Sequence, residues 1–189
     1  MPAIDPDTYM GKFKFADSSS DPAYVIGAAG ESHIGAVGGN SAYPTVALTT
    51  SGSGLYATGQ YIGVSGAASE ITGAARTAGG TGILYSGVLT DAGNQSASLE
   101  VWITDTAVVP PANKAAFGLS DSDLAHVLAV VPFSTYYSSG SGSVSLAASI
   151  GTGIKCAAGS TSLYQCVVSR GAGNYEANDL KFKWFFVQD

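Results

Sequence analysis

Residues 81–105, TGILYSGVLTDAGNQSASLEVWITD, contain two short apolar segments separated by the turn sequence DAGNQ. Runs of this length that are rich in β-branched and aromatic residues, and are bounded by Gly, Asn and Asp, are typical of strands. The same alternation of strand and turn continues along the chain from Thr45 onward. This recurring pattern, rather than any single motif, indicates the fold class.

About nine short strands are predicted in all, with turn residues at close spacing. Besides the two above, they are TVALTT (45–50), YIGV (61–64), HVLAVVPF (126–133), SVSLAASI (143–150), IKCA (154–157), LYQCVVS (163–169) and LKFKWFFVQ (180–188). No helices of 10–15 residues alternate with them, which argues against a parallel α/β sheet. The pattern predicts an all-β protein, an antiparallel sandwich of two sheets.

One short helix is expected near Ser120–Leu128. Ser120 can cap it, and Asp121 and Asp123 fall in its positive first turn. The same aspartates could start a calcium loop, but the Gly and the bidentate Glu that such a loop needs do not follow. N-capping is therefore the preferred interpretation.

The clearest hairpin is predicted between IKCA and LYQCVVS, across the turn AAGSTS. It would place Cys156 and Cys166 on facing strands. Two interpretations stay open for these cysteines, which are two buried small apolar residues or a disulfide. Their spacing matches no common zinc or redox motif.

Two parts of the chain differ in composition. Residues 1–43 are expected to form an N-terminal strand, GKFKF, and an extended arm rich in Gly, Ala and Ser, and residues 44–189 to form the sandwich. Phe13 and Phe15 alternate with lysines, as Phe182 and Trp184 do near the other end, so all four are expected to face the core. The arm, about residues 17–43, has too few large apolar residues for a core of its own.

Charge and composition exclude several partners. Charged residues make up only 12% of the chain, about half of the usual share, and the net charge is −6. The eight Lys and Arg are dispersed, so nucleic acid is not expected as a partner. No apolar run approaches the length of a membrane span, and the acidic start of the chain is not a signal peptide, which favours synthesis in a reducing cytoplasm.

The search for catalytic motifs is negative, and neither an enzyme nor a cofactor or metal site is predicted. His33 and His126 are the only histidines. No nucleophile elbow, dinucleotide-binding loop or Walker loop occurs. The candidates for function are instead apolar residues that could contact a partner protein, and they are Tyr24, Val25, Ile26, Ile34, Val37, Tyr43, Tyr136 and Tyr137.

Residues 73–189 resemble a known family in the order of their sequence segments. GAARTAGGTGILYSGVLTD, LEVWITD, AAFGLSDSDLAHVLAVVPF, IKCAAGSTSLYQCVVSRG and a final strand ending in VQD follow one another, with Arg170 at the exit of the predicted hairpin. This order is similar to that of tailed-bacteriophage capsid decoration, or cement, proteins. Residues 16–42 fit the pattern poorly.

The resemblance implies a jelly-roll-like sandwich on the capsid exterior, bound to the major capsid protein and associated with itself as a homotrimer. The chain would be made in the host bacterial cytoplasm and incorporated into the virion. Two other functions remain open, another virion component such as a tail or fibre protein, and a carbohydrate-binding module or adhesin. Solvent-exposed coplanar aromatic residues on one sheet face would favour the carbohydrate-binding module.

Overall fold

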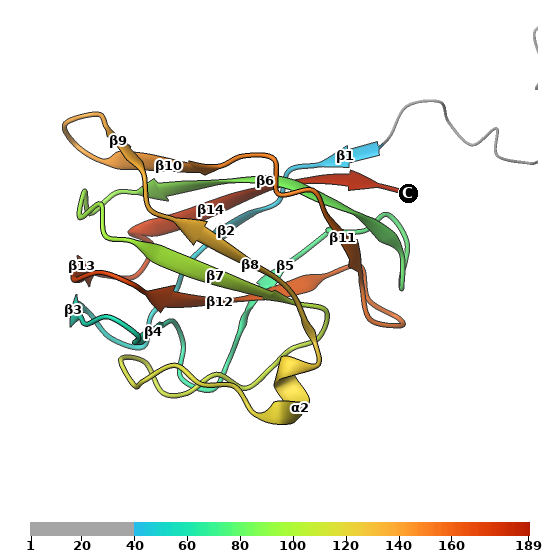
Figure 1. The fold of residues 1–189 in the computed structure, drawn as a ribbon, viewed down its shortest axis with the longest axis horizontal. Coiled ribbons are helices and arrows are strands. Elements are labelled where there is room, and N and C mark those ends of the chain that lie inside the picture. Colours follow the sequence, from blue (N-terminus) through green and yellow to red (C-terminus); the bar gives the residue numbers. More distant parts are fainter. Residues whose placement is uncertain (1–39) are drawn as a thin grey trace, which may run out of the picture. The chain divides into compact units, whose positions relative to one another are not determined.

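The computed structural model describes residues 40–189, and these form an antiparallel β-sandwich with one short helix (Figure 1). The predicted all-β fold class is confirmed. The predicted strand GKFKF, with Phe13 and Phe15, lies outside the described residues. No helix within residues 40–189 is long and apolar enough to cross a membrane.

The larger sheet has seven strands along the path β1-β14-β6-β10-β9, with β2 also pairing with β14 and β11 with β6. Its strands are β1 (Asn40–Ala42), β2 (Thr45–Ala47), β6 (Thr81–Asp91), β9 (Tyr136–Ser138), β10 (Ser143–Ala147), β11 (Thr152–Lys155) and β14 (Leu180–Gln188). All of its pairings are antiparallel.

The second sheet has five strands in the order β4-β12-β7-β8, with β5 also pairing with β12. Its strands are β4 (Tyr61–Ile62), β5 (Ser69–Ile71), β7 (Leu99–Thr104), β8 (Val127–Phe133) and β12 (Leu163–Ser169). A separate two-stranded ribbon joins β3 (Gly54–Tyr56) to β13 (Gly173–Tyr175).

The chain crosses repeatedly between the two large sheets. It runs from β2 to β4 and β5, back to β6, across to β7 and β8, back to β10 and β11, then to β12 and finally to β14. The central strands β2-β14-β6-β10 therefore face β4-β12-β7-β8, which is the strand arrangement of a jelly roll. The strand order therefore has the jelly-roll-like topology that the resemblance implies.

The predicted hairpin between IKCA and LYQCVVS is wrong. β11 pairs with β6 of the larger sheet, whereas β12 pairs with β4, β5 and β7 of the other. The turn itself forms, since the Ser160 amide donates to the Ala157 carbonyl at 3.0 Å. Local turn residues indicate that the chain reverses, but they do not indicate which sheet the next strand joins.

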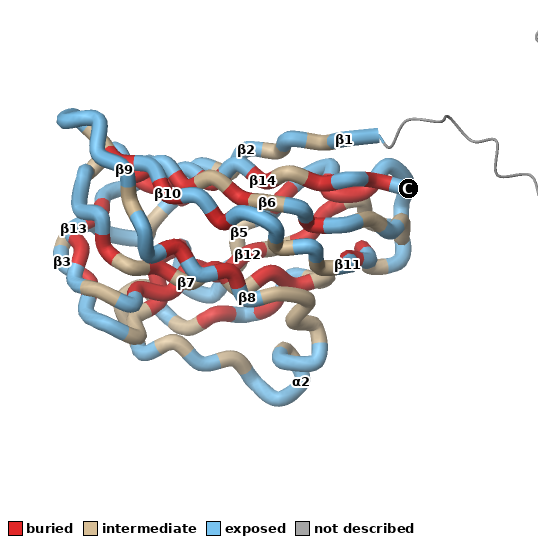
Figure 2. The backbone as a smooth tube through the Cα atoms, turned by 45° about the horizontal axis from the view of Figure 1, so that its top comes forward, coloured by how far each residue is buried: buried red, intermediate tan, exposed pale blue. Residues whose placement is uncertain are grey.

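The core lies between the two sheets, and Figure 2 shows buried residues along the strands of both. Aromatic rings make up its centre. Trp184 and Phe182 are both fully buried, as predicted, and Phe133 of β8 packs against them with ring centroids 6.0 and 5.8 Å away. The indole Nε1 of Trp184 donates to Oε1 of Gln165 at 2.7 Å, a buried hydrogen bond from one sheet to the other. Gly87, opposite Trp184 on β6, leaves room for the indole, because a Cβ there would lie 2.5 Å from Cζ3.

The helix α2 (Asp121–Leu124) is shorter than predicted. Ser120 is its N-cap, accepting a hydrogen bond from the Asp123 amide at 3.2 Å, so the capping interpretation is confirmed. The helix ends at Leu124 rather than near Leu128 because Val127 already pairs with Thr104 at the start of β8.

Two other boundaries differ from the expectation. β1 belongs to the larger sheet, since Ser41 pairs with Val187, so the sandwich already includes residues placed in the arm. Tyr136 and Tyr137, which lie between the predicted strands 126–133 and 143–150, belong to β9. The strands β1, β5, β9 and β13, of three residues each, were not predicted.

Candidate protein-binding surface

The seven-stranded sheet is apolar on both of its faces. Its inner face supplies the core, and its strands also direct large apolar side chains outward. We call the outward set the outer face, and it consists of Tyr43, Ile83, Tyr85, Tyr137, Val144, Leu146, Phe185 and Val187. Seven of the twelve exposed large hydrophobic residues within residues 40–189 belong to this set.

The strand register makes the outer face continuous. Ile83 of β6 is paired with Val187 of β14, and Val144 of β10 with Tyr137 of β9. Directly opposite side chains on paired strands lie about 5 Å apart, close enough to form one surface. A register shift between Phe185 and Phe186 leaves Tyr85 without a partner on β14, and its side chain is 54% exposed.

Tyr43 joins this surface from the connection between β1 and β2. Its ring meets that of Phe185 edge-on, with centroids 4.4 Å apart and an interplanar angle of 81°. The ammonium of Lys183 lies 5.9 Å from each of the two ring centroids. Tyr43 is still half exposed, so its ring both extends the outer face and leaves one side free.

The five-stranded sheet differs because its own chain covers its outward side. Trp102 on β7 and Cys166 on β12 pack in a second cluster with Phe117 from the segment that leads to α2. The Phe117 ring lies 5.4 Å from that of Trp102 and 6.3 Å from that of Tyr61. Figure 1 shows this segment and α2 running below β4, β12, β7 and β8. Within the described residues, no comparable segment covers the outer face of the other sheet.

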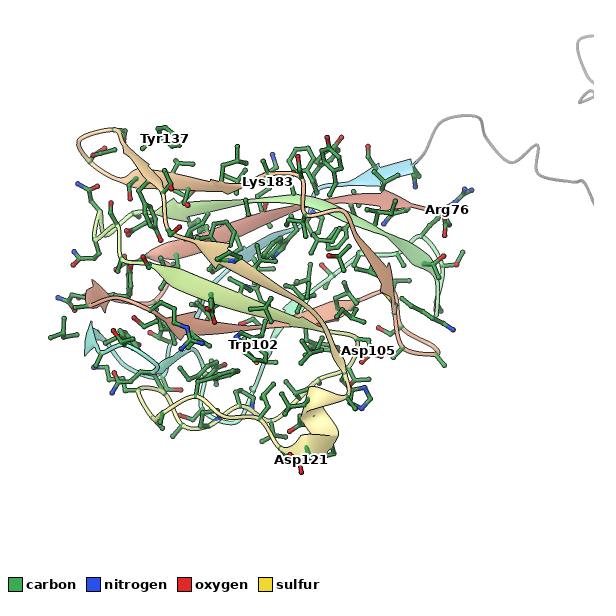
Figure 3. The ribbon with its side chains drawn as sticks, viewed as in Figure 1. Arg76, Trp102, Asp105, Asp121, Tyr137 and Lys183 are labelled. Atoms are coloured by element: carbon green, nitrogen blue, oxygen red, sulfur yellow. The ribbon has the colours of Figure 1, made fainter. Side chains whose placement is uncertain are left out.

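The charged side chains on the outward side of this sheet's strands are all lysines, and the carboxylate of Asp189, one residue beyond β14, accepts a hydrogen bond from the Thr81 hydroxyl at the edge of the sheet. Alternation along β11 and β14 points Lys155, Lys181 and Lys183 to the same side as the apolar residues. These are three of the six Lys and Arg within residues 40–189, and no Asp or Glu is among the outward strand residues of this sheet. Figure 3 shows Lys183 on this side, opposite Asp121 of α2. An apolar surface with lysines is complementary to an apolar surface that bears acidic residues.

The structure separates the sequence-predicted contact residues into three groups. Tyr43 and Tyr137 lie on the outer face, and Tyr137 is 69% exposed. Tyr136 instead points inward, where its hydroxyl donates to the Ala97 carbonyl at 2.6 Å and burial raises its pKa above the ordinary tyrosine value. The remaining candidates, Tyr24, Val25, Ile26, Ile34 and Val37, lie outside the described residues.

Sequence reasoning missed most of the outer face. Ile83, Tyr85, Leu146 and Val187 were assigned to strands without being recognised as exposed. A signal was available, because segments such as GILYSG and KWFFV carry apolar residues at consecutive positions instead of strict alternation. Such runs indicate a sheet whose two faces are both apolar.

The described residues hold no group of three or more His, Cys, Asp or Glu side chains that converge as metal ligands. The His126 Nδ1 lies 2.8 Å from Oδ1 of Asp105, a partly exposed pair at the end of α2. His33 lies outside the described residues. Arg170, singled out by the resemblance, pairs with Glu100 across β12 and β7 at 2.6 Å.

The two cysteines are free and buried, which agrees with their interpretation as small apolar residues and not with a disulfide. Cys156 lies in the main core and Cys166 in the second cluster, so the two thiols belong to different packing regions. Burial raises the pKa of Cys166 to about 12, which keeps the thiol protonated and unreactive.

Comparison of the chain with protein-family models, with curated proteins and with solved structures gives no match.

Proposed function

We propose that this chain is a structural, non-enzymatic virion protein that decorates a bacteriophage capsid, and that the outer face of its seven-stranded sheet binds the major capsid protein. The observation that carries the proposal is the difference between the two sheets. One sheet has its apolar outward side covered by residues 105–119, and the other has none of residues 40–189 over it.

The energetics favour a protein partner for this face. Removing a large apolar side chain from water stabilises a complex by about 1.5–3 kcal/mol. Contiguous exposed apolar patches on soluble proteins generally mark interaction sites. Tyr85, Leu146 and Val187 are each between 41% and 54% exposed in the isolated chain, so each has surface left to bury.

The viral setting of the proposal comes from the resemblance of residues 73–189 to decoration proteins. A rigid jelly roll with one uncovered face suits a protein that is added to a preformed shell. We further propose that the chain acts as a homotrimer on the capsid exterior and is made in the bacterial cytoplasm. A tail or fibre component would use the same binding physics and would differ in its location on the particle.

The carbohydrate-binding alternative has weaker support. Exposed tyrosines do gather on the outer face, but Tyr43 and Phe185 meet edge-on at 81° and do not form a flat platform for a sugar ring. Four of the eight outer-face residues are aliphatic, namely Ile83, Val144, Leu146 and Val187. A face of this kind is better suited to another protein surface.

Charge substitutions on the outer face test the proposal. Tyr85→Glu and Leu146→Glu place carboxylates on the predicted contact surface, and Val109→Glu places one at an apolar site elsewhere that is more exposed, at 70% against 54%. Binding is measured by co-sedimentation with shells assembled from the major capsid protein of the same virus. We expect both outer-face variants to bind at least about tenfold more weakly, the equivalent of 1.4 kcal/mol, while the control binds as wild type.

Equal binding by all three variants, or no binding by the wild-type chain, would contradict the proposal. Immunogold labelling of whole particles then distinguishes the capsid from the tail, and a glycan array tests the carbohydrate alternative.

A further inference from the structure

A buried carboxylate lies at the end of the sandwich where β6 stops. Asp91 is the last residue of β6 and is fully buried. Its Oδ2 accepts a hydrogen bond from the Ser96 amide at 2.7 Å and a long one from the Ser143 hydroxyl at 3.4 Å. Its Oδ1 has no hydrogen-bond partner among the described residues. A buried charge without compensation is costly, so this oxygen needs an explanation.

The surroundings of Asp91 add negative charge instead of neutralising it. Asp91 is paired in register with Leu180, which brings Asp179 at the start of β14 next to the end of β6. The Ala92 amide donates to the Asp179 carbonyl at 2.8 Å, which fixes the two segments together. Neither of the two ion pairs within residues 40–189 includes Asp91 or Asp179.

Three oxygens converge beside Gly93. From the position that a Cβ on Gly93 would occupy, Oδ2 of Asp179 is 3.2 Å away, Oδ1 of Asp91 is 3.4 Å away and the carbonyl of Asn174 is 3.6 Å away. The two carboxylate oxygens are thus at most about 6.6 Å apart, the sum of their two distances. The φ angle of Gly93 is not in the left-handed region, so the backbone does not demand glycine there. Glycine avoids the close approach that a Cβ would make to these oxygens, of which Oδ2 of Asp179 also accepts a hydrogen bond from the Glu176 amide at 2.8 Å.

A second buried polar group without a hydrogen-bond partner belongs to the residue that follows Asn174. Tyr175, on β13, is fully buried, and its hydroxyl has no hydrogen-bond partner among the described residues. The hydroxyl lies against Gly173, since a Cβ on Gly173 would be 3.0 Å from its oxygen, and it is not one of the three oxygens beside Gly93.

We propose that Asp91, Asp179 and the Asn174 carbonyl form a binding site for a hard divalent cation, of which Ca²⁺ fits best. All of the donors are oxygens, and a mixture of carboxylate and backbone carbonyl ligands with water is what Ca²⁺ takes. Mg²⁺ is a poorer fit because it demands a near-ideal octahedron, whereas these ligands come from three separate segments. The cation neutralises the two carboxylates and joins the ends of β6, β13 and β14.

The site is independent of the outer face, and its ion would act as a structural clamp. Asp91 begins the connection from β6 to β7, and Asn174 and Asp179 flank the turn from β13 to β14. Figure 1 shows β13 and the ends of β6 and β14 gathered at the left end of the sandwich. A cation that binds the folded chain but not the unfolded chain raises the free energy of unfolding by mass action.

The test uses the full chain after treatment with EGTA. Added CaCl₂ is expected to raise the melting temperature, and NaCl of equal ionic strength is not. Tb³⁺, a luminescent substitute for Ca²⁺, is expected to show saturable emission excited through tyrosine, displaced by Ca²⁺ more readily than by Mg²⁺. Asp179→Asn should weaken Tb³⁺ binding at least about tenfold, and Asp121→Asn, in the exposed acidic turn of α2, should leave it unchanged.

Asp91→Asn should abolish the Ca²⁺-dependent shift, and Gly93→Ala, which fills the space between the oxygens, should weaken binding even if Asp91→Asn fails to fold. Circular dichroism in EGTA establishes which variants are folded. A wild-type chain whose melting temperature and Tb³⁺ emission do not respond to millimolar Ca²⁺ overturns the proposal. So does an Asp179→Asn variant that binds Tb³⁺ as tightly as wild type.

Discussion

Replacing Trp184 by phenylalanine removes a buried side-chain hydrogen bond that joins the two sheets while keeping most of the aromatic packing. The indole is fully buried and donates to Oε1 of Gln165 at 2.7 Å. The Nε2 of Gln165 already has no partner within the described residues, so the substitution leaves the whole buried amide unsatisfied. That costs about 1–3 kcal/mol. The smaller ring also leaves unfilled volume, so we expect Trp184→Phe to lower the free energy of unfolding by roughly 2–4 kcal/mol in total.

The assay is guanidinium unfolding followed by far-UV circular dichroism, which does not depend on the tryptophan removed. With a slope of about 4 kcal/mol/M, a loss of 3 kcal/mol lowers the midpoint by about 0.7 M. Trp184→Ala should lose more, about 3–5 kcal/mol for the truncation and a further 1–3 kcal/mol for the amide.

Trp102→Phe is the matched control. Trp102 is only partly buried, and its indole bond to Glu100 is long, at 3.4 Å. We expect this variant to unfold within about 1 kcal/mol of wild type. If Trp184→Phe unfolded at the wild-type midpoint, or at that of Trp102→Phe, the claim that this bond and this packing join the two sheets would be refuted.

Four further predictions follow from the same structure. Gly87→Ala forces a Cβ against Trp184 and should cost about 1–3 kcal/mol in the same unfolding assay, while Gly153→Ala, with open space around it, should cost under 1 kcal/mol; equal costs would contradict the packing. The folded chain keeps the Cys166 proton, since its pKa is raised to about 12, while the unfolded chain releases it near pH 9, so stability should fall as pH rises from about 9. A pH-independent unfolding midpoint between 8 and 11 would count against that burial. Deletion of residues 17–37, which spares β1, should leave the sandwich folded and weaken binding to capsid shells; unchanged affinity would show that the arm is not an anchor. Light scattering should give the mass of a trimer, and a monomer both in solution and on the particle would exclude one.

The long strands could be predicted because their sequences carry the information locally. LKFKWFFVQ places Phe182 and Trp184 on one side of a strand, and both are buried as expected. The Ser120 cap was equally local, since its partner is the amide of Asp123. Features that depend on neighbours three or fewer residues away were thus within reach of the sequence.

The errors concern partners that are distant in the chain. The hairpin containing Cys156 and Cys166 failed because β11 and β12 find their partners in different sheets. The helix end was misplaced because pairing with β7 begins at Val127. The outer face was missed for the same reason, since the sequence does not reveal that residues 105–119 cover one sheet and not the other.

The cluster of oxygens around Asp91 could not be predicted from the sequence. Asp91 is separated from Asn174 and Asp179 by more than 80 residues, and the sequence around each is that of an ordinary turn. Only the register that pairs Asp91 with Leu180 brings them together.

A cryo-EM map of capsid shells incubated with the full chain tests the central claim most directly. The account predicts jelly-roll density on the shell exterior, with the β1-β14-β6-β10-β9 sheet facing the major capsid protein and Tyr85 and Leu146 in the contact. Shells without added density, or a sandwich that contacts the shell through α2 and the five-stranded sheet while the outer face points to solvent, would contradict it.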